Sequence, residues 1–221
     1  MIKAVFLDFY GTVVHEDGAI VDKIAQFIFE TGCAENKKKI GAFWWNEFQT
    51  LCRNAHGADF VTQRELERRS LEKTIKEFRS TANAADLSEM MFAHWIKPPI
   101  FEESRSFFES CPVPVYIVSN IDTMDLRRAL AYHALQPDGV FTSEDARSYK
   151  PRAELFRMAL RSAGLDEREA VHIGDSISSD VKGANACGIP AIWLNRSQKE
   201  VPNGVMAINH LLEAYDTEYL K

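Results

Sequence analysis

From Pro114 onward, the sequence alternates between short apolar runs and segments with helical periodicity, and this alternation restricts the possible folds more than any other feature. Four-residue apolar runs between turn residues are typical of strands that are buried on both faces. The segments between them repeat apolar residues every three or four positions, as amphipathic helices do. The alternation predicts a parallel sheet with covering helices, with strands at 115–118, 139–142, 170–173 and 191–194.

A further apolar run, residues 4–7, stands apart near the start of the chain and ends at Asp8 and a glycine turn. Between residues 16 and 97 the pattern is helical throughout, and a proline pair ends it. The simplest topology interrupts one sheet domain, after its first strand, with a helical insertion. With right-handed crossovers, we expect an α/β fold with a doubly wound, Rossmann-like core over 1–15 and 98–221 and an inserted α-helical cap domain over 16–97.

Composition limits the possible partners. The 221 residues are 46% hydrophobic, which supports a sizeable core, and the formal net charge of -6 gives no general attraction to nucleic acid or to anionic membranes. No apolar stretch is long enough to span a bilayer. The cysteines show no CxxC spacing and the first apolar run is too short for a signal peptide, which predicts a cytoplasmic protein with free thiols: Cys33, Cys52, Cys111 and Cys187. A monomer and a homodimer both remain possible.

Polar residues follow the predicted strands at the points where the strands end. In open α/β sheets, ligands bind outside the carboxyl ends of the strands, so these residues are expected to meet in one crevice. Each of them alone has an ordinary structural explanation, such as a turn or a helix cap, but their convergence on one sheet edge favours a functional site. The set comprises Asp8, Ser119, Asn120, Lys150, Asp175 and Asp180.

These residues match, in order and over nearly the whole chain, the four motifs of the haloacid dehalogenase-like hydrolase superfamily, which the chain therefore resembles. The resemblance implies that Asp8 is the nucleophile and forms a covalent aspartyl intermediate that water later releases. It implies that Ser119 and neighbouring backbone amides hold phosphoryl oxygens, with Asn120 and Thr12 completing the substrate-binding set. Lys150 would neutralise charge on Asp8 and on the transferring group.

The resemblance also implies a Mg²⁺ site formed by Asp8, Asp175 and the main-chain carbonyl of Tyr10. Asp180 would support this site, either by binding the ion directly or by contacting its ligands. Charge supports the same expectation independently. Three carboxylates and a phosphate would repel one another by roughly 4 kcal/mol for each close pair at an effective dielectric of about 20, and one lysine cannot offset this. A hard divalent cation can. The preferred interpretation is a Mg²⁺-dependent phosphohydrolase acting on a small phosphorylated metabolite.

Tyr10 departs from the superfamily's phosphatases, which usually carry a second Asp two residues after the nucleophile. That Asp protonates the leaving oxygen and then activates water. A phenol has a pKa of about 10 and is a poor general base near pH 7. One explanation is that the acid comes from the hinge of the insertion, where His15, Glu16 and Asp17 lie, or that the leaving group needs little protonation.

Three alternatives remain open. The chain also resembles the L-2-haloacid dehalogenases, which have Asp-x-Tyr-Gly-Thr and a Ser-Asn pair like Ser119-Asn120 and use no metal, although they usually lack the carboxylate found here as Asp175. Phosphonoacetaldehyde hydrolase, in which a cap lysine forms an imine, is a more remote model, suggested by residues 37–39, which are all lysine. A weakly active relative that binds a phosphorylated ligand is the third. Tyr10 is the feature that supports this last possibility.

Overall fold

The computed structural model describes residues 1–221 and contains a six-stranded sheet in the order β3-β2-β1-β4-β5-β6. All five pairings are parallel, and Val5 of β1 lies between Val115 of β2 and Val171 of β4. The predicted strands are confirmed. The sequence did not predict β6, which has only three residues. The strands are β1 (Ala4–Leu7), β2 (Val115–Ser119), β3 (Gly139–Thr142), β4 (Ala170–Gly174), β5 (Ala191–Leu194) and β6 (Met206–Ile208).

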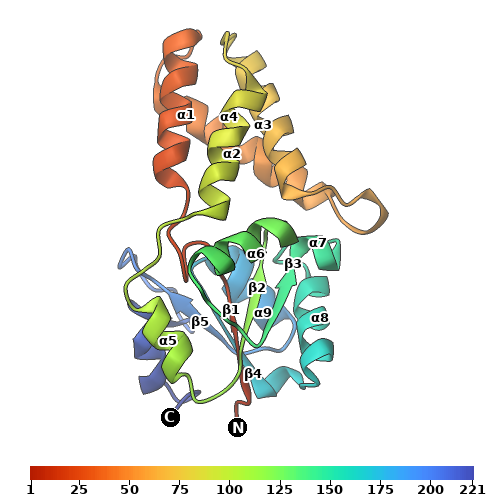
Figure 1. The fold of residues 1–221 in the computed structure, drawn as a ribbon, viewed down its shortest axis with the longest axis vertical. Coiled ribbons are helices and arrows are strands. Elements are labelled where there is room, and N and C mark those ends of the chain that lie inside the picture. Colours follow the sequence, from red (N-terminus) through yellow and green to blue (C-terminus); the bar gives the residue numbers. More distant parts are fainter.

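Helices cover both faces of the sheet, so the doubly wound α/β class is confirmed (Figure 1). Alternate strand residues point to opposite faces, as the pleat requires. Leu7 packs in a cluster with residues of α5, α6 and η4, while Phe6 packs in a cluster with residues of α8 and α9. These elements are α5 (Ser104–Ser110), α6 (Thr123–Tyr132), α7 (Ser143–Ala146), α8 (Ala153–Ala163), η2 (Glu167–Glu169), η3 (Ile177–Val181), α9 (Lys182–Ala186) and η4 (Leu211–Asp216).

The chain between β1 and β2 is helical and contains no named strand. The first four α-helices of this stretch, together with η1, are called here the helical segment and stand beyond the carboxyl ends of the strands, whereas α5 packs on the sheet and both termini lie at the opposite end of the sheet (Figure 1). No helix of the structure combines the length and apolar character needed to cross a membrane. The helical segment comprises α1 (Gly18–Thr31), α2 (Lys37–Asn54), η1 (Gly57–Asp59), α3 (Gln63–Glu77) and α4 (Ala84–Ile96).

Two passes of the chain connect the helical segment to the sheet. They run side by side and are hydrogen-bonded, from His15 N to Pro99 O at 2.8 Å and from Phe101 N to Val13 O at 3.2 Å. The buried apolar cluster continues through this hinge, because Val13 belongs to the same cluster as the sheet residue Leu7. The hinge therefore contains a packed core as well as backbone hydrogen bonds.

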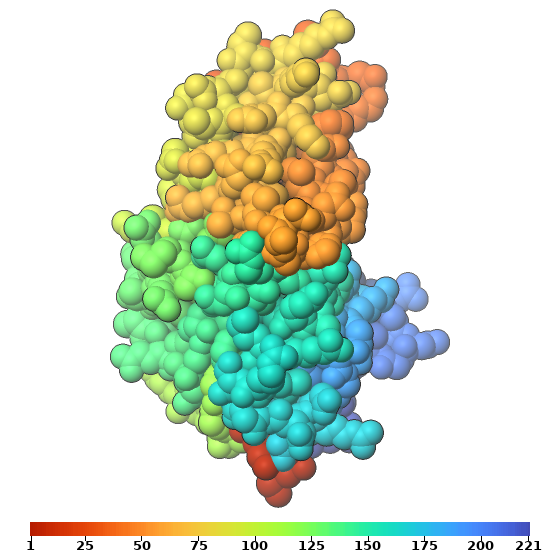
Figure 2. Space-filling model, turned by 90° about the vertical axis from the view of Figure 1, so that its right-hand side faces the viewer, coloured from red at the N-terminus to blue at the C-terminus, as the bar shows by residue number.

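The helical segment also touches the sheet domain away from the hinge. Arg64 of α3 forms a two-pronged ion pair with Asp125 of α6, with N–O distances of 2.7 and 2.6 Å. Near the other end of the contact, Tyr149 donates its hydroxyl hydrogen to Val61 O at 2.8 Å. In the space-filling view the orange atoms of the helical segment lie directly on green and teal atoms of the sheet domain (Figure 2). The segment covers the edge where the polar residues converge.

Candidate active site

Asp8 directly follows β1, the strand at which the sheet order reverses. Its backbone N–H donates to Ile173 O at 2.9 Å, which continues the ladder and fixes the residue at the carboxyl end of the strand. The side chain is buried. Its Oδ1 accepts hydrogen bonds from Lys150 Nζ at 2.7 Å and Ser119 Oγ at 3.2 Å. Since both bonds end on Oδ1, the second oxygen, Oδ2, is the one available for chemistry or for a cation.

Lys150 lies at the centre of the site. Its buried ammonium group contacts Asp8 Oδ1, Asp180 Oδ1 at 2.6 Å and the carbonyl of Val118 at 2.9 Å. Burial alone would lower the pKa of Lys150, but the carboxylates of Asp180 and Asp8 outweigh it and raise the pKa above its usual value. Lys150 therefore stays protonated and gives the site a permanent positive charge.

The side-chain amide of Asn120 holds the backbone of Lys150 from both sides. Lys150 N–H donates to Asn120 Oδ1 at 2.7 Å, and Asn120 Nδ2 donates to Lys150 O at 3.2 Å. The structure thus gives this side chain a positioning contact, while its expected part in substrate binding stays a prediction. Ser119 is also buried, with its hydroxyl directed at Asp8.

Asp180 forms the second ion pair of Lys150. Its Oδ1 accepts from Lys150 Nζ and lies 3.0 Å from His172 Nε2, and its Oδ2 accepts from Ser176 N at 2.9 Å. Burial opposes ionisation, but Lys150 and His172 outweigh it and hold the pKa of Asp180 below its usual range. His172 lies within β4 and is fully buried, and nothing in the sequence spacing indicates its contact with Asp180, eight residues away.

Asp175 lies against Gly11, in the turn that follows Asp8. Gly11 has a φ of +86°, and a Cβ at this position would lie 2.5 Å from Asp175 Oδ2. A side chain at residue 11 would therefore collide with the carboxylate. Burial, followed by the charges of Asp8 and Asp180, raises the pKa of Asp175 to about 8. Burial, then the charges of Asp17 and Asp8, raise the pKa of the hinge residue Glu16, and Asp175 acts in the opposite direction.

The donor set fits a hard divalent cation. Asp8, Asp175 and Asp180 each offer a carboxylate oxygen, and these atoms lie within 4.8 Å of one another. Only Asp8 and Asp180 pair with the lysine ammonium group, and the raised pKa of Asp175 reflects a shortage of positive charge even before an anionic substrate enters. Oxygen ligands in excess of local cations are the environment in which proteins bind Mg²⁺.

The side chain of Tyr10 is hydrogen-bonded, and that of Thr12 is buried. The Tyr10 hydroxyl donates to the backbone carbonyl of Trp95, at the end of α4, at 2.6 Å. Burial, then the charges of Asp125 and Asp17, raise the pKa of Tyr10 well above its usual value. Thr12 is fully buried, and its carbonyl accepts from Arg196 Nη2 at 2.7 Å. The catalytic role expected for Tyr10 and the substrate contact expected for Thr12 both stay predictions.

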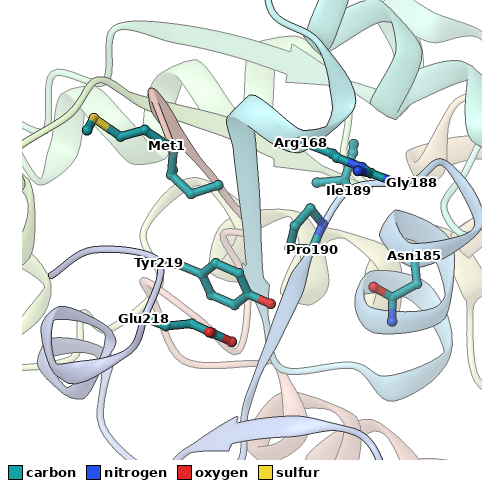
Figure 3. Close-up of a pocket in the computed structure, with 9 residues that line it drawn as sticks. Met1, Arg168, Asn185, Gly188, Ile189, Pro190, Glu218 and Tyr219 are labelled. Carbon is teal, nitrogen blue, oxygen red and sulfur yellow. The ribbon is translucent and has the colours of Figure 1, made fainter.

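Other candidates lie far from this edge. The lining of a surface pocket of about 480 Å³ includes Met1, Arg168 and Pro190, which lie shortly before β1, β4 and β5, so the pocket lies at the amino ends of the strands (Figure 3). Lys37 and Lys39 form ion pairs with Asp22 and Glu35 at 2.6 and 2.5 Å. Both lysines lie in the first turn of α2, at the far end of the helical segment (Figure 1).

Comparison with known proteins gives matches to hydrolases. The family model of haloacid dehalogenase-like hydrolases matches residues 2–188. The phosphoserine phosphatase of Thermus thermophilus is 30% identical over 122 residues, which are 51% of this chain and 47% of that protein. The phosphoglycolate phosphatase of Photorhabdus laumondii is 24% identical over 209 residues, covering 87% and 80% of the two chains. The first curated relatives are thus matched over about half of their length.

Solved structures share the whole fold. The L-2-haloacid dehalogenase of Xanthobacter autotrophicus superposes with a TM-score of 0.75 at 18% identity, covering 97% of each chain. A magnesium-bound structure of YfnB from Bacillus subtilis superposes with a TM-score of 0.76 at 20% identity, also covering 97% of each chain. At such identities the likeness concerns the arrangement of sheet and helices, so the chemistry has to be argued from the residues of the site.

Proposed function

The chain belongs to the haloacid dehalogenase-like hydrolases, and within this family of hydrolytic enzymes we propose that it is a magnesium-dependent phosphohydrolase acting on a small phosphorylated metabolite. The observation that carries the proposal is the cluster of Asp8, Asp175 and Asp180 around a single lysine. A phosphate dianion could not enter this cluster without an added cation. The phosphatases among the relatives support the same class of substrate.

In the proposed mechanism Asp8 Oδ2 attacks the phosphorus atom while the bond from phosphorus to the leaving oxygen breaks. The leaving oxygen takes up a proton and departs as an alcohol. Water then attacks the phosphorus of the aspartyl phosphate, the bond to Asp8 breaks, and inorganic phosphate and the free carboxylate are restored. A Mg²⁺ ion held by Asp8, Asp175 and the carbonyl of Tyr10 would supply charge neutralisation and substrate alignment.

The remaining residues fix the charges and positions that this reaction needs. Burial raises the pKa of Asp8, and Lys150, which directs its ammonium group at Asp8 Oδ1, offsets part of this rise and stabilises negative charge as it develops. Asp180 holds the ammonium group, and Asn120 holds the backbone of the same lysine. Ser119 fixes the rotamer of Asp8 and is the proposed contact for a phosphoryl oxygen.

For the proton of the leaving group we propose the hinge, as the sequence suggested. Of its three polar residues, Asp17 accepts a hydrogen bond from Trp95 Nε1 at 3.3 Å, and His15 stacks on Phe101, with ring centroids 3.9 Å apart. Glu16 has neither of these contacts, and both Asp8 and Asp175 affect its pKa. Glu16 is therefore the proposed proton donor.

We also propose that the helical segment acts as a cap domain that encloses the substrate. Its contacts through Arg64 and Tyr149 hold it over the edge that carries Asp8. The predicted cytoplasmic location is supported by the four cysteines, which are all free in the structure.

Metal-independent dehalogenation is the second candidate, because the sequence Asp8-Phe9-Tyr10-Gly11-Thr12 and the pair Ser119-Asn120 suit it. Asp175 opposes it, since an extra carboxylate next to the nucleophile would repel an anionic haloacid. A phospho-ligand-binding relative with little turnover is the remaining alternative. One set of assays separates the three.

Phosphate release from p-nitrophenyl phosphate is measured with Mg²⁺ and with a chelator, for the wild type and for Asp8→Asn. Mg²⁺-dependent release that is lost in Asp8→Asn supports the proposal. Chloride release from L-2-chloropropionate in the presence of a chelator would instead establish the dehalogenase. Shifts of the melting temperature with phosphate esters, without turnover, would establish the binding protein.

A further inference from the structure

Glu67 is a buried carboxylic acid within the helical segment. Its side chain lies on α3 and is 3% exposed, and its Oε1 atom has no hydrogen-bond partner. Leaving a buried polar atom unpaired costs about 1–3 kcal/mol, so proteins seldom keep one without a use. The other buried polar residues on this face of α3 are satisfied: Ser70 accepts from Trp44 Nε1 at 3.0 Å, and Thr74 donates to Ser70 O at 2.7 Å.

The position of Glu67 relates it to the active site. Gln63 and Arg64, one helical turn earlier on α3, donate their backbone N–H groups to Asp122, which lies three residues after Ser119. One turn is about 5.4 Å, so Glu67 lies just above the contact between the helical segment and the sheet domain. The charge of Asp17, in the hinge, acts on Glu67 directly.

A chain of contacts leads from this pair of acids to the nucleophile turn. Asp17 accepts from Trp95 Nε1, and the carbonyl of Trp95 accepts from the hydroxyl of Tyr10. Besides burial, the charges of both Asp17 and Asp8 raise the pKa of Tyr10. Asp17 is therefore the group that acts both on Glu67 and on Tyr10, which directly follows the loop residue Phe9 after Asp8.

Asp17 has Trp95 Nε1 as a donor and His94 as a neighbouring basic group, whereas Glu67 Oε1 has no donor and no cation acts on Glu67. Burial, and then Asp17, raise the pKa of Glu67 to about 8. Burial, and then the charge of Glu67, raise the pKa of Cys52 in α2, but the Cys52 thiol is a weak hydrogen-bond donor and carries no positive charge. An ammonium group brought by the substrate would supply three donors and the charge, and Glu67 would release its proton to solvent as the pair forms.

We propose that Glu67 is a specificity-determining residue that binds a positively charged amino group, so that the preferred substrate is a small phosphomonoester with an ammonium group at its other end. This inference rests on the proposed function, because it assigns the phosphate end to Asp8 and Lys150. It gives the helical segment a definite role, which is to select the substrate through one buried carboxyl.

The test compares O-phosphoethanolamine with n-propyl phosphate, which has a methyl group in place of the ammonium group. The ratio of their kcat/KM values is measured for the wild type, Glu67→Gln and Glu65→Gln. Glu65 is an exposed residue of the same helix that pairs with Arg69, so its variant is a control for the loss of one acid. Any difference between the two leaving groups cancels when the ratio of one variant is divided by that of another.

We expect the wild type to favour O-phosphoethanolamine and Glu67→Gln to lose about ten- to a hundredfold of that ratio, as for one hydrogen bond to a charged group. Glu65→Gln retains the ratio. A wild-type ratio near one, or a ratio that Glu67→Gln leaves unchanged, overturns the inference while Asp8-dependent hydrolysis of p-nitrophenyl phosphate preserves the proposed function. If p-nitrophenyl phosphate is not hydrolysed, the proposed function fails, and calorimetric binding of O-phosphoethanolamine, expected to weaken in Glu67→Gln, decides the role of Glu67 separately.

Discussion

Asp122 Oδ1 accepts the backbone N–H of Gln63 at 2.7 Å, and this bond joins the loop after β2 to the first residue of α3. Asp122 Oδ2 accepts the next N–H, that of Arg64, at 3.0 Å. The first amides of a helix have no partner within the helix and carry partial positive charge, so a carboxylate there is favourable. Because the same loop directly follows Ser119, the last residue of β2, the position of the helical segment is coupled to the proposed phosphate site.

Replacing Asp122 by Ala is expected to lower the free energy of unfolding by about 1–2 kcal/mol, the usual cost of losing a helix cap, and to raise KM several-fold for any substrate enclosed by the helical segment. Urea unfolding and steady-state kinetics measure the two effects. Asn36→Ala is the matched control: Asn36 Oδ1 accepts Lys39 N at 3.0 Å at the far end of α2. This control should lose stability without a change in KM. Equal KM effects in both variants would contradict the coupling.

Lys150→Met is expected to destabilise the protein as well as to inactivate it. The substitution leaves Asp8 and Asp180 buried without their shared cation, and breaking a buried ion pair from one side costs about 3–5 kcal/mol. Urea unfolding in a chelator measures the loss. Lys73→Met removes an exposed pair with Glu47 and should change stability by less than about 1 kcal/mol. A Lys150→Met protein as stable as the wild type would show that Lys150 does not stabilise the folded protein.

The sequence predicted the parts of the fold that depend on local pattern. The apolar run at residues 4–7 and the four later runs all form strands, because a run buried on both faces has a strong signal. Strand β6 was missed since three residues at a sheet edge, half-buried in part, show no such pattern. The convergence of Asp8, Lys150 and Asp175 could be predicted because the carboxyl ends of parallel strands share one edge.

Contacts between distant segments could not be predicted in this way. Nothing in the periodicity indicates that Tyr10 donates to Trp95, or that Asn120 uses its amide on the backbone of Lys150. Glu67 shows the limit most clearly: a charged residue on a polar helix is ordinarily exposed. Its burial follows from the packing of α3 between α2 and α4, which is a property of the assembled bundle.

The buried state of Glu67 gives a prediction about stability and pH. Burial and Asp17 raise its pKa to about 8 in the folded protein, against about 4.3 in an unfolded chain. Between these values the folded state binds more protons than the unfolded state, so the free energy of unfolding falls as pH rises. Glu67→Gln lacks this group, and its stability relative to the wild type should therefore rise by about 3 kcal/mol from pH 5 to pH 8.

Urea unfolding without substrate at pH 5, 6, 7 and 8 measures this difference. The control is Glu65→Gln, whose stability should follow that of the wild type at each pH. Asp17 and the Cys52 thiol are the titratable groups that act on Glu67, so Asp17→Asn should reduce the wild-type loss. Parallel curves for the wild type and Glu67→Gln would mean that the carboxyl ionises in the folded protein as freely as in the unfolded chain.

The last prediction concerns the proton of the leaving group and separates Glu16 from Tyr10. If the hinge residue Glu16 supplies it, Glu16→Gln should lower kcat for an alkyl phosphate by about 10²-fold or more, but should change kcat much less for p-nitrophenyl phosphate, whose leaving oxygen needs little protonation. Tyr10→Phe should leave the ratio of alkyl to aryl rates near the wild-type value, because the Tyr10 hydroxyl donates to Trp95 O. It should instead lower the free energy of unfolding by about 1–3 kcal/mol through the unpaired carbonyl. Loss of alkyl phosphate turnover in Tyr10→Phe with an unaffected Glu16→Gln would reverse the two assignments.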